Sequence, residues 1–418
     1  MRNLRLAIAL GLTLSVAGCS AAEDSSNPAP DPAAVQKAEQ EKARVENVKA
    51  EINRLADGYD YDGAIKLAKK DSSKALNQMV GGLEDEKEQV SAWEDPDQIP
   101  HLFFHSLVVD PERAFDDGSS SQGYANYMVT QKEFTAILES LYARDYVLVN
   151  PEDFASVDDG GKMEYRDIML PKDKKPLVLS VDDLSYYEYM ENDGFASKLV
   201  LDGDGTVRNE YVDAQDETQI GAFDVTTMVD DFIAEHPDFT YRDARGLIAM
   251  TGYNGVFGYR TSASQYPESK TLKADQKDAK EIAEAMKDSG WVFASHSWGH
   301  IATGTVSMGR LERDTKLWKD EVQPLVGKTM HYIYPFGSDI AQTQSYSGAR
   351  YEFFKDQGFK YFYGIDGTIR SWMQQGDNYQ RQMRINVDGL QMAKEQRGDR
   401  PVLETFFNVQ DVIDPARK

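Results

Sequence analysis

Acidic residues and histidines gather at points where this sequence predicts that β-strands end. Asp182 and Asp183 directly follow one short apolar run, His296 and His300 follow a second, and Phe336 follows a third. Two histidines four residues apart can face one ion, and imidazole and carboxylate groups are good ligands for Zn²⁺. In a (β/α) barrel the carboxyl ends of the strands converge on one face, so we expect the three clusters to meet there. The sequence therefore predicts a metal site. The alternative is that these are unrelated polar residues on the surface.

The adjacent carboxylates of Asp182 and Asp183 suggest a division of labour. One of them can bind the cation while the other stays free to take a proton from an activated water. The spacing does not decide which carboxylate does which. Cys19 is the only cysteine in the chain, so the metal must be bound by aspartate, glutamate or histidine.

The same clusters resemble the motifs of a known enzyme family. Residues 180–183, Ser-Val-Asp-Asp, resemble the T-F-D-D-G motif of the NodB-type polysaccharide deacetylases, which form carbohydrate esterase family four. Residues 296–300, His-Ser-Trp-Gly-His, match their H-S/T-x-x-H motif, and residues 334–337, Tyr-Pro-Phe-Gly, are similar to the stretch that supplies their oxyanion-binding amide. The motifs occur in order within residues 98–390. The resemblance implies an α/β fold, a distorted (β/α) barrel that often has seven strands.

The resemblance also implies a role for each matched residue. Asp182 would be the general base. Asp183, His296 and His300 would hold a divalent cation, with Zn²⁺ expected first and Co²⁺, Ni²⁺ or Mn²⁺ as alternatives. The backbone N–H of Phe336 would help to hold the oxyanion of the reaction. Together these roles predict hydrolytic removal of an acetyl group from an N-acetylated, or O-acetylated, glycan.

Two departures from the family pattern affect this prediction. Leu184 stands where the family has glycine after the aspartates, which alters the loop beside the metal. The usual C-terminal Leu-x-His is also missing, because no histidine follows His331. Members with a permuted arrangement, resembling the poly-N-acetylglucosamine deacetylases, carry a Tyr-His pair on the first strand instead, and Phe104 with His105 resembles that pair. His105 is therefore a candidate general acid, or else a histidine of the core or rim.

Further residues near the expected site have two readings each. Arg384 matches a late arginine common in these sequences, and it could orient Asp182 by a charged hydrogen bond or be purely structural. Trp298, Tyr186 and Tyr187 flank the proposed site, and their rings could stack on a sugar or pack in the core.

The N-terminus predicts export and lipid anchoring. Arg2 and Arg5 precede an apolar run at residues 6–14, which is too short to span a bilayer and is typical of a secretory signal. Residues 16–19, Val-Ala-Gly-Cys, resemble the lipobox of bacterial lipoproteins, in which the cysteine is lipidated after cleavage. We therefore expect an extracytoplasmic, membrane-anchored bacterial lipoprotein attached through Cys19.

Composition divides the remaining chain into three parts. Residues 20–34 lack the apolar content to fold and predict a disordered tether, residues 35–95 predict a helical segment that could dock a protein partner, and residues 96–418 predict the barrel. The formal net charge of -24 argues against a nucleic-acid partner.

Several elements of the barrel can be predicted individually. Thr130 with Glu133 predicts a capped helix start, and Ser289-Gly290 predicts a helix end. The stretch 202–205, Asp-Gly-Asp-Gly, departs from a calcium loop at two required positions, so we expect a hairpin turn there. The apolar runs that predict strands are 102–104, 146–149, 177–181, 291–294 and 332–334.

The sequence leaves a second function open. A glycan-binding lipoprotein without catalytic activity could retain the metal site as a structural or recognition element, and the missing C-terminal histidine and Leu184 favour that alternative. Asp182 favours the enzyme, because a purely structural metal would not need it.

Overall fold

The computed structural model describes residues 31–116, 118–399 and 401–417, so the expected signal peptide and Cys19 lie outside the described residues. The chain divides into two compact units, Met1–Asn47 and Val48–Lys418. None of the helices in the described part of the chain is both long and apolar enough to cross a membrane.

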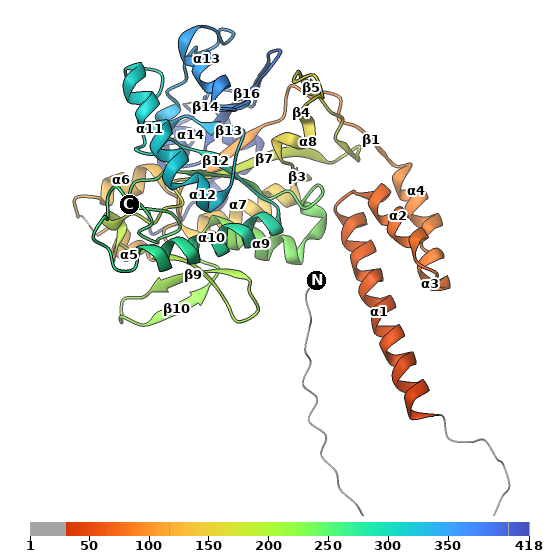
Figure 1. The fold of residues 1–418 in the computed structure, drawn as a ribbon. Coiled ribbons are helices and arrows are strands. Elements are labelled where there is room, and N and C mark those ends of the chain that lie inside the picture. The colour runs from red at the N-terminus through yellow and green to blue at the C-terminus, as the bar shows by residue number, and fades with distance from the viewer. Residues whose placement is uncertain (1–30, 117, 400, 418) are drawn as a thin grey trace, which may run out of the picture. The chain divides into compact units, whose positions relative to one another are not determined.

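A helical segment precedes the barrel (Figure 1). It contains α1 (Pro32–Asp57), α2 (Tyr61–Lys70), α3 (Lys74–Asn77) and α4 (Val80–Lys87). Helix α1 begins within the stretch expected to be a tether, with proline at a position that tolerates it. The helical segment expected to reach residue 95 has its last helix, α4, end at Lys87. The extended residues that follow, β1 (Val90–Ala92), pair antiparallel with β6 (Met169–Pro171), so tertiary pairing overrides the helical pattern there.

Seven parallel strands close into a barrel, which confirms the predicted fold class. Hydrogen bonding follows the order β7, β11, β12, β13, β14, β16 and β2, and β2 pairs with β7 to complete the circle. The barrel is distorted, because β12 and β13 share one paired position, Ser295 with Tyr332. The strands are β2 (His101–Phe104), β7 (Lys175–Asp182), β11 (Gly246–Met250), β12 (Trp291–Ser295), β13 (His331–Ile333), β14 (Tyr361–Ile365) and β16 (Gln380–Asn386).

Smaller strands extend or decorate the barrel. The pairing β3–β7 is parallel, whereas β15–β16, β4–β5 and the three-stranded sheet β8–β9–β10 are antiparallel. The expected hairpin at residues 202–205 joins β8 to β9, and the Asp202 carboxylate accepts the backbone N–H groups of Asp204 and Thr206. These strands are β3 (Tyr146–Leu148), β4 (Ala155–Val157), β5 (Met163–Tyr165), β8 (Lys198–Leu201), β9 (Val207–Val212), β10 (Thr218–Gly221) and β15 (Trp372–Gln375).

The longer helices lie outside the barrel strands (Figure 1). Thr130 and Glu133 form the expected capping box at the start of α7, and Gly290 ends α10 with a left-handed backbone (φ 108°). Helix α10 buries Ala279, Ile282 and Met286 at helical spacing against the core. The helices are α5 (Pro111–Ala114), α6 (Ser121–Tyr127), α7 (Gln131–Ala143), α8 (Pro151–Phe154), α9 (Val225–Glu235), α10 (Leu272–Ser289), α11 (Met308–Glu321), α12 (Gln323–Val326), α13 (Gly348–Asp356), α14 (Gly389–Gln396) and α15 (Val409–Val412), with short 3₁₀ turns η1 (Glu188–Met190), η2 (Pro237–Phe239), η3 (Pro335–Gly337) and η4 (Leu403–Thr405).

The C-terminal residues hold the loop between α6 and α7 in place. The Arg417 guanidinium donates to the buried Glu133 carboxylate (2.6 Å) and to the carbonyl oxygens of Ala125 and Met128. Removing one partner of a buried ion pair leaves an uncompensated charge, so this pairing favours a single arrangement of the loop. Tyr127, the last residue of α6, and Met128, which follows it, line the cavity described next.

Candidate active site

The three predicted clusters meet at the carboxyl end of the barrel. Asp183, His296 and His300 each offer a ligand atom, and these atoms lie within 4.8 Å of one another. Oδ2 of Asp183 lies 3.7 Å from Nε2 of His300. The structure therefore brings together the residues that the sequence nominated as metal ligands.

His296 is held in the tautomer that a metal ligand needs. Its Nδ1 lies 2.8 Å from the carbonyl oxygen of Ile333 on β13. Because a carbonyl can only accept, Nδ1 carries the proton and donates it, which leaves the lone pair on Nε2. Burial lowers the pKa of His296 to about 4, although the nearby carboxylates of Asp182 and Asp183 act in the opposite direction. The imidazole is therefore neutral at physiological pH.

The backbone around the other two ligands adopts conformations that are costly for residues with a side chain. Asp183 has φ 61°, Ser297 has φ 56° and His300 has φ 47°. Such conformations persist only where surrounding contacts impose them, and they gather at functional sites. One contact is the backbone N–H of Asp183, which donates to the carbonyl oxygen of Ala249 on the neighbouring strand β11.

The donor set fits a divalent cation. Two imidazole nitrogens and one carboxylate oxygen make three protein ligands, the number typical of catalytic zinc sites, in which further positions stay open for water and substrate. Residues Asp183, His296 and His300 would hold the ion.

Asp182 has a different partner from Asp183. Arg384, fully buried on β16, donates to both of its carboxylate oxygens, at 2.6 and 2.9 Å. Burial alone would raise the pKa of Asp182, but the charge of Arg384, helped by His296, outweighs burial and holds that pKa well below its usual range. Of the two readings of Arg384, the contact matches the one in which it orients Asp182.

Arg384 is itself fixed from several sides. Its guanidinium lies over the ring of Phe103 at 4.1 Å, and Nη1 also donates to Oγ of Ser180 (3.1 Å). Ser180 in turn lies 2.8 Å from Nε2 of the buried His101. These contacts aim the Asp182 carboxylate at a single position beside the ligand triad.

His105 lines the same cavity as the ligands. It follows β2, is half-buried, and its ring contacts Phe103 edge to face (5.8 Å between ring centres). His105, Asp182 and the ligand triad all line one cavity of about 510 Å³.

The apolar walls of this cavity come partly from barrel strands, with Phe103 on β2 and Ile365 on β14, and partly from residues outside the strands. Phe336, in η3, has φ 58°, and its exposed ring contacts the ring of His300 (4.3 Å between ring centres). The other lining side chains are Phe103, Ser106, Tyr127, Met128, Tyr187, Tyr189, Met190, Ile365, Asn386 and Asp388.

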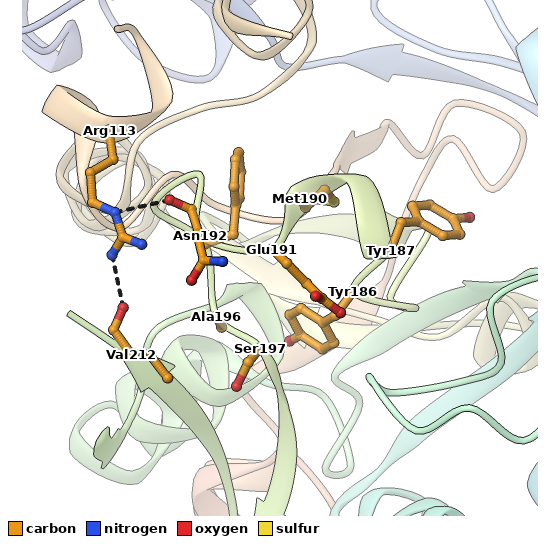
Figure 2. Close-up of a pocket in the computed structure, with 10 residues that line it drawn as sticks. Arg113, Tyr186, Tyr187, Met190, Glu191, Asn192, Ala196, Ser197 and Val212 are labelled. Carbon is orange, nitrogen blue, oxygen red and sulfur yellow. Dashed lines mark hydrogen bonds between the residues drawn. The ribbon is translucent and has the colours of Figure 1, made fainter. Parts of the chain in front are cut away.

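Of the three aromatic residues expected to flank the site, Tyr187 lines this cavity, whereas Trp298 and Tyr186 do not. Trp298 packs so closely over Gly252 that a Cβ there would lie 2.1 Å from its ring, and its Nε1 donates to Glu321. Tyr186 is buried, and its hydroxyl accepts from Nδ2 of Asn209. Figure 2 shows Tyr186 in a separate, smaller cavity of about 210 Å³. Trp298 and Tyr186 therefore pack against other residues of their loops and lie outside the lining of the cavity that holds the ligand triad.

Other cavity residues carried no signal in the sequence beyond their residue type. Tyr127, at the end of α6, and Tyr189, in η1, belong to no motif, and the sequence predicts neither of these short elements. The sequence places Tyr187 beside the site with a ring that could stack on a sugar or pack in the core, whereas in the structure its hydroxyl donates to Oδ1 of Asp183 at 2.6 Å. A buried tyrosine beside a metal-binding motif is the one hint that could have singled it out.

Fold and site together define a seven-stranded (β/α) barrel with a three-ligand cation site beside an arginine-paired carboxylate. No family model matches the chain, and no curated protein matches it. Among solved structures, the deacetylase PplD of Streptococcus pyogenes in complex with acetate is 16% identical, with 71% of this chain and 96% of that chain covered and a TM-score of 0.39. A polysaccharide deacetylase from Bacillus cereus is 14% identical, with 71% and 68% covered and a TM-score of 0.37. The function is therefore inferred from the site itself.

Proposed function

We propose that this protein is a metal-dependent deacetylase of the NodB type that removes acetyl groups from an N-acetylated, or O-acetylated, glycan of the cell surface or its surroundings. One observation carries the proposal. The ligand triad Asp183, His296 and His300 opens into the same cavity as the Asp182 carboxylate, which Arg384 keeps ionised. A metal site that served only structure would need no such ionised carboxylate beside it.

The chain's own residues account for each proton in the reaction. A divalent cation, Zn²⁺ by the preference of this donor set, would polarise the acetyl carbonyl and make a water more acidic. Asp182 accepts the proton of the attacking water, since Arg384 holds it ionised and in place. The backbone N–H of Phe336 donates to the oxygen on which negative charge develops. His105, when protonated, donates to the departing amine.

The rim of the cavity supports a glycan as the substrate. Among the described residues, the exposed large aromatic side chains are Tyr127 (51% exposed), Tyr189 (54%) and Phe336 (70%), and all three line this cavity. Exposed aromatic faces gathered at one opening mark a binding surface, and they suit the flat apolar faces of sugar rings.

The test is acetate release from N-acetylglucosamine oligomers and peptidoglycan fragments by the zinc-loaded protein. The His300→Ala variant should lose bound zinc and release no acetate, because one of three ligands is gone. Zinc content is measured by elemental analysis and acetate by a coupled assay. Glycan binding without acetate release by the zinc-loaded wild-type protein would favour the non-catalytic lipoprotein instead.

We further propose that the protein is a bacterial lipoprotein anchored outside the cytoplasm through Cys19. The motif at residues 16–19 supports this proposal. Cys19→Ser should move the protein from the membrane fraction to the soluble fraction without changing acetate release, because the anchor lies far along the chain from the site. Fractionation followed by immunoblotting measures this, and membrane retention of the variant would point to docking through the helical segment.

A further inference from the structure

We propose that Tyr187 is a positioning residue that holds Asp183 as a ligand through a single oxygen. This inference rests on the proposed metal site. Tyr187 lies in the loop after β7, in the segment where this sequence departs from the family motif. Its hydroxyl lies 2.6 Å from Oδ1 of Asp183 and 2.7 Å from Oγ1 of Thr251.

The direction of these hydrogen bonds follows from the carboxylate. An ionised Asp183 can only accept hydrogen bonds, so the Tyr187 hydroxyl donates its one proton to Oδ1. The buried Thr251 hydroxyl then donates to the Tyr187 oxygen, and Ser185, 3.0 Å from Thr251, donates to Thr251. Three hydroxyl groups thus form a one-way chain that ends on Asp183. Short hydrogen bonds to an ionised acceptor are stronger than those between neutral groups. The bond from Tyr187 to Asp183 is therefore the one that fixes the carboxylate.

Ring stacking holds the Tyr187 hydroxyl at this point. Its ring stacks on Tyr253 (4.7 Å between centres, 11° between planes) and on Tyr189 (5.5 Å, 17°). The ring is buried between these neighbours, so the hydroxyl cannot swing away from Asp183 without opening the stack. Both ends of the contact are therefore fixed, the hydroxyl by the stack and the aspartate by its backbone bond to Ala249.

The consequence for the metal site concerns the number of ligand atoms. With Oδ1 engaged by Tyr187, the oxygen left for a cation is Oδ2, the one that lies 3.7 Å from Nε2 of His300. The carboxylate is then hindered from turning to bind a cation through both oxygens. Positions around the ion stay open for water and an acetyl oxygen, as a hydrolytic site requires.

The test is the zinc affinity of Tyr187→Phe, measured on the whole protein by competition with a chromogenic chelator. Loss of a hydrogen bond to a metal ligand typically weakens metal affinity by about 10- to 100-fold, and we expect a loss in that range. The absorption spectrum of the Co²⁺-loaded variant should also change, since it reports coordination number. The unfolding temperature of the metal-free variant checks that the fold is retained.

Tyr189→Phe is the matched control. It removes a hydroxyl from the same stack and keeps the ring, but that hydroxyl is outside the chain that ends on Asp183. Zinc affinity equal to wild type in Tyr187→Phe, or an equal loss in both variants, would overturn the inference. A selective loss in Tyr187→Phe, found in a protein that releases no acetate from any glycan, would support the inference while overturning the proposed function.

Discussion

Asp182→Asn should lower the turnover number for acetate release by at least about 10²- to 10⁴-fold, the range typical of losing a general base, while zinc affinity stays close to that of wild type. The reason is that Asp182 is bonded to Arg384 through both oxygens, whereas the ligand triad contains Asp183 instead. Asparagine cannot accept the proton of the attacking water. Steady-state kinetics and chelator competition measure the two effects separately.

The same substitution leaves Arg384 buried without its counter-charge, which commonly costs about 3–5 kcal/mol of stability. Kinetics should therefore be measured well below the unfolding temperature of the variant. Arg384→Gln is the informative companion, because burial would then raise the pKa of Asp182 without an opposing charge. As the pH is lowered, the activity of Arg384→Gln should therefore begin to fall at a higher pH than the activity of the wild-type protein does. If Asp182→Asn lost zinc as completely as Asp183→Asn, the division of labour between the two carboxylates would be wrong.

The parts of the site that the sequence predicted are those that follow directly on recognisable strands. β7 and β12 are short apolar runs, so the ends that carry Asp182 and His296 could be located from the pattern. β16 could not, because its buried positions hold Gln380, Gln382 and Arg384, whose polarity hides the strand. β11 is an apolar run too short to distinguish from a buried helical turn.

The positions of residues that depend on loop conformation could not be predicted from the sequence pattern. Asp183 and Tyr186 both have positive φ, at 61° and 47°, so the chain turns sharply after β7 and sends Tyr186 and Tyr187 to different neighbours. No spacing rule gives such a turn. The sequence therefore gives Tyr186 and Tyr187 the same two readings, whereas in the structure the Tyr187 hydroxyl donates to Asp183 and Tyr186 packs elsewhere.

We propose His105 as the general acid from its place directly after β2, nearly two hundred residues before His296 in the chain. Both side chains line the same cavity, and β2 lies beside β7 in the barrel. No histidine follows His331, so a donor for the departing amine must come from elsewhere in the site. His331 itself is buried, with its ring nitrogens 2.8 Å from Glu152 and Tyr363, and it does not line the cavity.

His105→Ala should reduce turnover of the N-acetylated substrate by about 10²- to 10⁴-fold with zinc content unchanged. An activated acetate ester has a leaving group that needs no proton, so its hydrolysis should be spared much of the loss. If amide and activated-ester hydrolysis were damaged equally, with zinc still bound, His105 would be a residue that positions the substrate and the proton would have another source.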